Sequence, residues 1–467
     1  MAQIIDLPRN EGGIATALDI LKQQFGERLQ TGQAVREQHA HTTTWIRNQA
    51  PDAVVFARST EEVADIVKVC AAHKVPVIPF GTGTSLEGHV NAPAGGVSLD
   101  LSQMDAIVEV NAGDLDCRVQ PGVTRTALNT HLRDQGLFFP IDPGADASLG
   151  GMTSTRASGT NAVRYGTMKD NVLAVEAVMA DGTIIRTAQR ARKSSAGYDL
   201  TRLMVGSEGT LGVITEITLR LQGIPEAMSA ASCSFPSVTE ACRTVMAVIQ
   251  YGLPVARIEL LDALTVKAVN AYSRLDLPET PLLLLEFHGS EAGVVEQAET
   301  FGMLADEHGG SGYAATTTTE ARNKLWQARH DAYWAQLALR PGAKAVATDV
   351  CVPISRLAEA VGASEAKAKE LNLTAPIVGH AGDGNFHAAP LLDLDDPEEV
   401  ARVETFVSWL NELAISMDGT CTGEHGIGQG KRPYLRKELG ASVDVMASIK
   451  RALDPDNIMN PGKILAG

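Results

Sequence analysis

Cysteine is scarce in this chain and is not arranged in pairs. Six cysteines are scattered along 467 residues, and none of them forms a C-x-x-C pair. This spacing argues against a disulfide framework and is typical of reduced thiols, so it predicts a cytoplasmic location. The six positions are Cys70, Cys117, Cys233, Cys242, Cys351 and Cys421.

Long apolar runs are also missing. No window approaches the roughly 20 apolar residues that a membrane-spanning helix needs. The first residues, Met1 to Asp6, lack the basic stretch and apolar run of a signal peptide. We therefore expect no signal peptide and no spanning helix, while peripheral association with an inner membrane stays open.

Positive charge is in deficit. Lysine and arginine total 40 against 56 acidic residues, which gives a formal net charge of -16. This balance repels phosphate backbones, so we expect no nucleic acid partner. An acidic surface would suit a basic protein partner such as a c-type cytochrome.

What the chain does contain is enough apolar sequence for a large core. Hydrophobic residues make up 44% of it, and its length exceeds what a single core usually supports. The pattern of expected strands and helices changes after residues 223–225, which contain a glycine and a proline. We predict an N-terminal helical segment (1–46), a first domain (47–225), a second domain (226–420) and a C-terminal segment (421–467).

Short strands alternate with helices along most of the chain. The first domain is expected to begin with a strand at 53–56, a helix at 60–73 and a strand at 75–78. The second domain repeats this mixture, with a helix at 238–251 and an apolar strand at 281–287. The order predicts an α+β or α/β architecture.

Three glycine-rich loops in the first domain could hold a dinucleotide. They span 79–88, 142–166 and 205–215. Glycine lets successive backbone N–H groups point at one anion, which suits a pyrophosphate. The first loop is neither a G-x-G-x-x-G loop nor a P-loop with its lysine. Each loop alone could be a turn or a surface excursion, but three within one domain indicate a shared cofactor.

The sharpest chemical signal is a pair of histidines around a glycine-rich turn. His380 and His387 flank 382–385, which is a poor helix and a good turn. A strand–turn–strand hairpin would bring the two imidazoles together. Paired imidazoles are typical metal ligands.

A third ligand is needed, and Glu424 supplies a carboxylate within a second glycine-rich motif, 419–428. Two histidines and one carboxylate form a set with open positions for a substrate, and such a set accepts zinc, manganese or iron. This leaves His425 as the acid–base group. Asp383 could replace Glu424 as the third ligand.

These motifs together resemble the family of cytochrome-linked D-lactate dehydrogenases and glycolate oxidase FAD subunits. That family is related to D-2-hydroxyglutarate dehydrogenase and belongs to the vanillyl-alcohol oxidase superfamily. The resemblance runs from about residue 40 to residue 465, and the segments 326–330 and 349–355 are most like the D-lactate branch. The other matching segments, in order, are 79–88, 143–151, 157–168, 205–212, 378–387, 419–428 and 460–463.

The resemblance implies an α+β fold. It consists of a PCMH-type two-subdomain FAD-binding domain, an α+β substrate (cap) domain and a small C-terminal helical segment. FAD is expected to bind noncovalently, because the first loop carries threonine and serine where covalent relatives use histidine. The FAD-binding residues are expected to be Pro79, Gly81, Thr82, Gly83, Thr84, Ser85, Gly88, Pro143, Gly144, Ala145, Gly150, Gly151, Thr155, Ser158, Gly159, Asn161, Tyr165, Gly166, Glu208, Gly209, Gly212, Val213, Ile214 and Asn460.

The resemblance also assigns catalytic roles. It places the metal on His380, His387 and Glu424, and the catalytic histidine at His425. Arg329 falls on the carboxylate-binding arginine, and Lys344 on a second anion-binding position. Arg156 departs from the pattern, because relatives often carry a small residue there.

The expected reaction is oxidation of a small D-2-hydroxy acid, D-lactate to pyruvate first, with glycolate and D-2-hydroxyglutarate as rival substrates. A metal-bound hydroxyl would lose its proton to His425, and a hydride would pass to flavin N5. Cytochrome c, a quinone, an electron-transfer flavoprotein and oxygen all stay open as acceptors, and a homodimer is allowed. Two other classes remain, a flavin-free metallohydrolase and a non-catalytic flavin-binding electron-transfer subunit.

Overall fold

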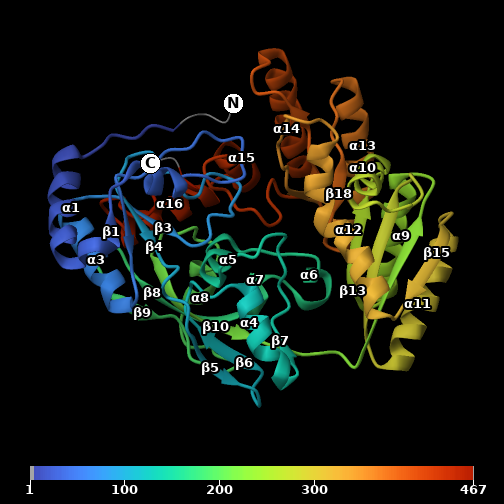
Figure 1. Cartoon of the computed structure of the whole chain (residues 1–467), viewed down its shortest axis with the longest axis horizontal. Helices are drawn as coiled ribbons and strands as arrows, with labels where there is room; N and C mark the ends of the chain where they lie inside the picture. The colour runs from blue at the N-terminus through green and yellow to red at the C-terminus, as the bar shows by residue number, and fades with distance from the viewer. Residues whose placement is uncertain (1–4, 466–467) are drawn as a thin grey trace. The chain divides into compact units, whose positions relative to one another are not determined.

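The computed structural model describes residues 5–465, which divide into two compact units. The N-terminal unit comprises 5–158, 166–224 and 424–465, and the central unit comprises 159–165 and 225–423. The chain therefore leaves the N-terminal unit and returns to it. In Figure 1 the red helices α15 (Arg432–Leu439) and α16 (Ser442–Leu453) lie with the blue elements of that unit.

The first layer of the N-terminal unit is a four-stranded sheet in the order β1-β2-β4-β3, with β2, β4 and β3 parallel. Helix α3 (Thr60–Ala72) begins where Ser59 accepts a hydrogen bond from the Glu62 backbone. Its buried residues recur at helical spacing and pack into the core of this sheet together with α1. The elements here are α1 (Glu11–Phe25), η1 (Gly26–Arg28), β1 (Leu29–Gln30), α2 (Gln33–Gln38), β2 (Ala53–Phe56), β3 (Val77–Phe80) and β4 (Val97–Asp100).

The second layer is a five-stranded antiparallel sheet in the order β5-β6-β10-β8-β9. Its buried strand residues form a core with α4 and α5. The elements are β5 (Ile107–Asn111), β6 (Asp116–Val119), α4 (Arg125–Leu132), η2 (Arg133–Gln135), β7 (Leu137–Phe138), α5 (Leu149–Thr155), α7 (Met168–Asn171), β8 (Val172–Val178), β9 (Ile184–Arg186), α8 (Leu200–Met204), β10 (Val213–Arg220) and β11 (Gln222–Gly223).

The segment 142–166, predicted as one long loop, instead contains helices α5 and α6 (Ala162–Tyr165). Helix α5 forms because the Ser148 side chain caps its N-terminus. Gly150 lets that helix lie against Pro121, since a Cβ there would come within 2.5 Å of the Pro121 Cβ. Two of the glycines that suggested a loop therefore serve helix packing and capping.

The C-terminal segment joins the edge of the first sheet. The Val77 backbone N–H donates to the Ile458 carbonyl at 2.8 Å, and the Asn460 N–H donates to the Val77 carbonyl at 2.9 Å. These bonds give partners to backbone groups at the edge of β3 that would otherwise be unpaired. The last segment of the chain thus completes a sheet that the first hundred residues begin.

The central unit is built on a seven-stranded sheet in the order β15-β12-β14-β13-β18-β19-β17. Along β14 (Leu282–Gly289), Leu283 and Leu285 enter one core, while Leu282 and Leu284 enter another. Successive side chains of a strand face opposite sides, so both faces of this sheet are covered. This explains the unbroken apolar run.

Helices α9, α11, α13 and α14 pack on one face of this sheet, and α10 and α12 pack on the other. Figure 1 shows these helices, coloured from yellow-green to red along the chain, in the same unit as β13. The elements are β12 (Ala227–Ser234), α9 (Val238–Tyr251), β13 (Val255–Leu261), α10 (Ala263–Ser273), α11 (Glu291–Asp306), β15 (Ser311–Thr316), α12 (Thr319–Ala338), β16 (Lys344–Ala345), β17 (Val350–Cys351), η3 (Ile354–Arg356), α13 (Leu357–Glu370), β18 (Ile377–Gly379), η4 (Ala381–Asp383), β19 (Asn385–Ala388), β20 (Leu391–Leu392) and α14 (Pro397–Ser416).

Across residues 5–465, no helix is both long enough and apolar enough to cross a bilayer.

Candidate functional site

The first glycine-rich loop of the N-terminal unit offers a row of backbone donors. Among the described residues, the N–H groups of 81–86 find no protein acceptor. Gly83 has φ +66°, which turns the backbone in a way that glycine adopts easily. Successive unsatisfied donors of this kind suit an anion such as a pyrophosphate.

Three side-chain oxygen atoms of the same unit are also left without a hydrogen-bond partner. The Ser85 Oγ, Ser207 Oγ and Asn460 Oδ1 atoms are buried and make no hydrogen bond within the described part of the chain. Buried polar atoms are normally satisfied, so such atoms indicate a missing ligand or water. The residues present therefore fit a dinucleotide that accepts from the first loop and bonds to these side chains.

Glu208, predicted to contact the cofactor, holds the C-terminal motif in place. Its buried carboxylate accepts from the backbone N–H groups of Ile427 at 2.7 Å and Gly428 at 2.8 Å. His89 lies 3.2 Å from the same carboxylate. A Cβ at Gly426 would lie 2.7 Å from the Glu208 Oε1 atom, so only glycine fits there. Glu208 thus fixes the backbone just after His425.

The other predicted FAD-binding residues lie in several places. Gly159, Asn161 and Tyr165 belong to the central unit. In that unit Asn161 accepts from Arg257 at 2.9 Å. The remaining residues lie in the N-terminal unit: Pro79 in β3; Gly81, Thr82, Thr84 and Gly88 in the first loop; Pro143, Gly144 and Ala145 before α5; Gly150, Gly151 and Thr155 in α5; Ser158 and Gly166 beside α6; and Gly209, Gly212, Val213 and Ile214 at the start of β10.

Arg156, the departure from the family pattern, packs on the third loop. Its guanidinium donates to the Val205 carbonyl at 3.0 Å and lies over Gly206. Burial, with a smaller effect of Arg202, lowers the pKa of Arg156. The bulk of Arg156 therefore supports the backbone that leads to Glu208.

In the central unit, the predicted hairpin is confirmed. Strands β18 and β19 are antiparallel partners joined by η4, with Val378 opposite His387. The ring centroids of His380 and His387 lie 5.6 Å apart. The glycine-rich turn thus brings His380 and His387 together through a hairpin, without a helix.

Both imidazoles are oriented through the same ring nitrogen. The Nδ1 atom of His380 lies 2.8 Å from a Glu259 oxygen, and the Nδ1 atom of His387 lies 2.8 Å from the Thr348 carbonyl. Because both partners are acceptors, they favour the tautomer with hydrogen on Nδ1 and a lone pair on Nε2. This is the arrangement that metal-ligating histidines usually show, so the donor set fits a metal ion.

Glu259 connects two of the predicted site residues, and its role was not predicted from the sequence. Its carboxylate, 0% exposed, accepts from His380 on one oxygen and from Arg329 Nε on the other at 2.7 Å. Burial alone would raise the pKa of Glu259, but His380 and Arg329 hold it below its usual range. A single acidic residue inside an apolar strand, between Ile258 and Leu260, was the available signal.

A second missed residue, Asp349, orders the segment before Glu424. Its buried carboxylate accepts from Asn385 at 2.8 Å and Thr422 at 2.9 Å. A Cβ at Gly423 would lie 2.3 Å from the Asn385 side-chain nitrogen, so a larger residue there would displace Asn385. Asp349 also lies 3.9 Å from the Nδ1 atom of His387.

The other predicted site residues have distinct surroundings. Glu424 directly follows Gly423 in the chain, and its carboxylate lies 4.0 Å from the His425 ring. Lys344 is exposed in the two-stranded sheet of β16 and β20. Asp383, the alternative ligand, has an exposed side chain at the end of η4. The ligand and catalytic roles remain predictions.

The central unit also holds a buried hydrogen-bonded chain. The Tyr165 hydroxyl lies 2.8 Å from His288 Nδ1, and His288 Nε2 lies 2.8 Å from Glu286. Burial raises the pKa of Glu286, but the His288 hydrogen bond and Arg257 outweigh it and lower that pKa to about 2. Glu286 therefore carries a negative charge inside the unit, 3.7 Å from the Arg257 guanidinium.

Comparison with known proteins agrees with this picture. Residues 51–188 match the FAD binding domain family, and residues 224–464 match the family of FAD linked oxidases, C-terminal domain. The chain is 53% identical over 443 residues to a probable mitochondrial D-lactate dehydrogenase of Danio rerio, covering 94% of this chain and 89% of that protein. It is 48% identical to the mitochondrial D-lactate dehydrogenase [cytochrome] of Arabidopsis thaliana, covering 89% and 73%.

More distant relatives extend the match. Glycolate oxidase subunit GlcD of Bacillus subtilis is 35% identical, with 94% of each chain covered. Among solved structures, p-cresol methylhydroxylase superposes with a TM-score of 0.81 at 17% identity, covering 98% of each chain. At that identity the likeness shows the fold alone, and it confirms the predicted α+β, PCMH-type architecture.

The fold and the family matches define an FAD-dependent oxidoreductase that acts on CH–OH donors. More narrowly, the chain belongs to the family of FAD-linked oxidases that contains the D-lactate dehydrogenases and glycolate oxidase subunits, as predicted. Its activity is oxidation of 2-hydroxy acids with FAD. A flavin-free metallohydrolase does not agree with the FAD-binding match.

The predicted cytoplasmic location is wrong. The D-lactate dehydrogenases from Danio rerio, Arabidopsis thaliana, Kluyveromyces lactis and Saccharomyces cerevisiae, 38–53% identical, are all named mitochondrial. None of the six cysteines forms a disulfide within residues 5–465. Free thiols, however, distinguish a reducing compartment from an oxidising one, and they do not separate one reducing compartment from another.

Proposed function

We propose that the protein oxidises D-lactate to pyruvate, using noncovalent FAD and one divalent metal ion. The relatives named D-lactate dehydrogenase, at up to 53% identity, favour lactate over glycolate and D-2-hydroxyglutarate. Glycolate is the second candidate, because the Bacillus subtilis relative at 35% identity is a glycolate oxidase subunit.

One observation carries the proposal. The buried carboxylate of Glu259 bonds on one side to His380 and on the other to Arg329. A proposed metal ligand and the proposed carboxylate-binding group are thereby held by one residue, which supports a single site for metal and substrate. Since Glu259 engages Arg329 at Nε, the two terminal nitrogens form the fork that would hold a substrate carboxylate.

The metal would be held by His380 and His387 through Nε2 and by Glu424. The bonds at both Nδ1 atoms support this choice of ligand atom. The metal would lower the pKa of the substrate hydroxyl, and zinc, manganese and iron all suit such ligands. Asp349 is committed to Asn385 and Thr422, so we assign it the role of holding the 419–423 segment that leads into Glu424.

Proton transfer falls to His425. Neutral imidazole can accept the hydroxyl proton near neutral pH, and Glu208 fixes the backbone two residues further on. Lys344 is proposed as a second anion contact. The flavin supplies the hydride acceptor when bound. The first loop carries Thr82 to Ser85 and no histidine, which supports noncovalent binding.

The proposed electron acceptor is a c-type cytochrome. The Arabidopsis thaliana and Kluyveromyces lactis relatives are named D-lactate dehydrogenase [cytochrome], and a net charge of -16 would attract a basic protein. A quinone, an electron-transfer flavoprotein and oxygen are the rivals that the same assay can compare. Salt should slow reduction of a cytochrome more than reduction of a neutral quinone.

The test is anaerobic flavin bleaching with D- and L-lactate, glycolate and D-2-hydroxyglutarate, with and without a chelator. D-lactate should bleach the flavin fastest, and chelator should abolish bleaching. His425→Asn should slow bleaching about 10²- to 10⁴-fold, while the exposed-histidine control His131→Asn should bleach at the wild-type rate. Wild-type bleaching by His425→Asn, or bleaching that survives complete metal removal, would contradict the proposal.

A further inference from the structure

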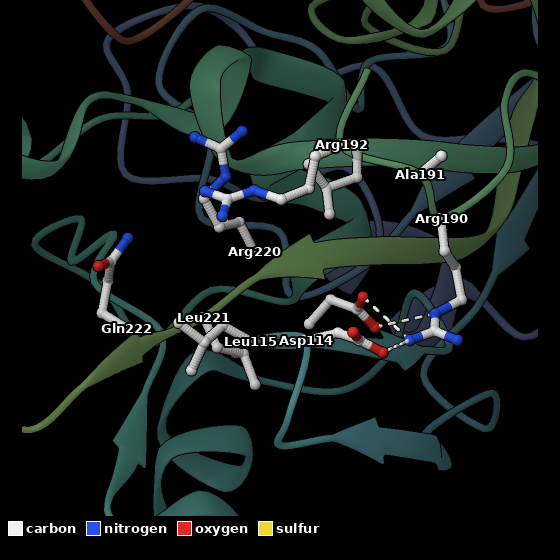
Figure 2. A pocket seen from close by; sticks show the side chains of 10 residues that line it. Asp114, Leu115, Arg190, Ala191, Arg192, Arg220, Leu221 and Gln222 are labelled. Atoms are coloured by element: carbon white, nitrogen blue, oxygen red, sulfur yellow. Dashed lines mark hydrogen bonds and ion pairs between the residues drawn. The ribbon is translucent and has the colours of Figure 1, made fainter. Parts of the chain in front are cut away.

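A cavity of about 300 Å³ opens at the far end of β10, inside the N-terminal unit. Figure 2 shows the side chains that line it. They come from three places in the sequence: the turn between β5 and β6 (114–116), the segment after β9 (190–192) and the end of β10 with the residues that follow (220–222). Leu173 completes the wall.

Three arginines line this cavity, and their charges are neutralised unequally. Arg190 donates to Asp114 at 2.7 Å and to Asp116 at 3.1 Å, as the dashed lines in Figure 2 show. Within residues 5–465, neither Arg192 nor Arg220 has an ion pair or a side-chain hydrogen bond. The Arg220 Nε atom is buried without a partner.

The two unpaired arginines share one cavity. Both Arg192 and Arg220 line the cavity, and in the view of Figure 2 their guanidinium groups are drawn apart from that of Arg190. Like charges that line one small cavity repel, and burial of part of one of them increases the cost. Two unpaired arginines in one cavity are unusual in a chain of net charge -16. A bound anion would neutralise their charge. Guanidinium forks match the oxygens of a phosphate group.

The cavity also has apolar side chains in its wall. Leu221 is 1% exposed and Leu115 is 39% exposed, and both face the cavity. Together with Leu173 they offer an apolar surface beside the arginines. A ligand with an anionic head and a small organic body would use both. The volume lies at the lower end for small-molecule pockets and is too small for a dinucleotide.

We propose that this cavity binds a phosphate-bearing small molecule, with Arg192 and Arg220 as its phosphate contacts. The site is separate from the flavin loops. Arg220 ends the strand that Val213 begins, and seven residues of strand span roughly 23 Å. The ligand is therefore distinct from FAD, and binding does not depend on the proposed substrate.

The test uses FAD-loaded full-length enzyme, so that the pyrophosphate site is filled. Inorganic phosphate and phenyl phosphate are titrated by calorimetry and by thermal shift, with chloride at matched ionic strength. Saturable binding is expected, weakened at least tenfold in both Arg220→Gln and Arg192→Gln. Arg133→Gln, an exposed arginine in η2 with the same loss of charge, should bind like wild type.

The two probes separate the sources of the phosphate. Tighter binding of phenyl phosphate would show that the leucine surface holds an organic body, whereas equal binding would assign the site to free phosphate. Arg192 is exposed, so Arg192→Gln tests the site without risk to the fold. The proposal is overturned if binding is not saturable, if chloride has the same effect, or if Arg192→Gln binds like wild type.

Discussion

The two units of this protein present polar groups in opposite ways. In the N-terminal unit, backbone N–H groups of the first loop and the hydroxyls of Ser85 and Ser207 have no partner in the described chain. In the central unit, the buried carboxylates of Glu259 and Asp349 each accept hydrogen bonds from protein side chains. The proposed cofactor surface would thus be completed by its ligand, whereas the proposed catalytic surface is oriented by the protein beforehand.

The largest effect is expected when a proposed metal ligand is removed from the central unit. His387→Ala should lose the metal and lower kcat for D-lactate about a thousandfold, because a metal contributes several kcal/mol to such a reaction. Metal content by mass spectrometry and anaerobic flavin reduction measure both effects. His131→Ala is the control. Full metal content in His387→Ala would remove this residue from the ligand set.

Glu259→Gln tests whether orientation by the protein matters. An amide cannot accept from His380 and Arg329 on both sides, because its nitrogen is a donor. Metal affinity and kcat/KM should each fall about 10- to 100-fold, as for other residues that orient metal ligands. Glu286→Gln is a matched control, since Glu286 is also a buried carboxylate beside a histidine. Its metal affinity should match wild type, and equal losses in both variants would indicate general destabilisation.

In the N-terminal unit, smaller effects are expected from single donors. Ser85→Ala and Ser207→Ala should each weaken FAD binding about threefold to tenfold, the usual effect of one neutral hydrogen bond. Fluorescence titration of the apoprotein with FAD measures this. The exposed hydroxyl of Ser102 provides the control, Ser102→Ala. Unchanged affinity in both variants would mean that water, and not the cofactor, satisfies these hydroxyls.

The smallest effect concerns Lys463, which follows Asn460 in the C-terminal motif. Burial lowers its pKa to about 7, and it donates to the carbonyls of Asn91 and Pro461. The unfolded pKa is near 10.4, so between these values the unfolded chain binds more protons, and this group's contribution to stability rises with pH. In Lys463→Met, the rise in Tm between pH 7 and 9 should be smaller by roughly a few degrees. The exposed Lys68→Met should keep the wild-type slope.

How much the sequence predicts depends on how each group is held. The hairpin of His380 and His387 was predictable because a glycine-rich turn is a local signal. The glycine-rich loops were recognisable for the same reason, and their role in binding flavin stays a prediction. Helix α5 was predicted as a loop because its cap and its contact with Pro121 were not recognised. Glu259 was not predictable as a site residue, because its partners lie 70 and 121 residues away. Such pairing is decided by strand order, which no local pattern reports.

The return of the C-terminal segment to β3 affects how the chain can mature. Until Ile458 and Asn460 have emerged from the ribosome, the edge of the first sheet lacks its last neighbour, and the Glu208 carboxylate lacks two of its donors. The central unit lies almost wholly between these segments, so it can fold while its host is unfinished. We expect a nascent chain released near residue 423 to contain a protease-resistant central unit and an N-terminal half that is degraded and retains no flavin.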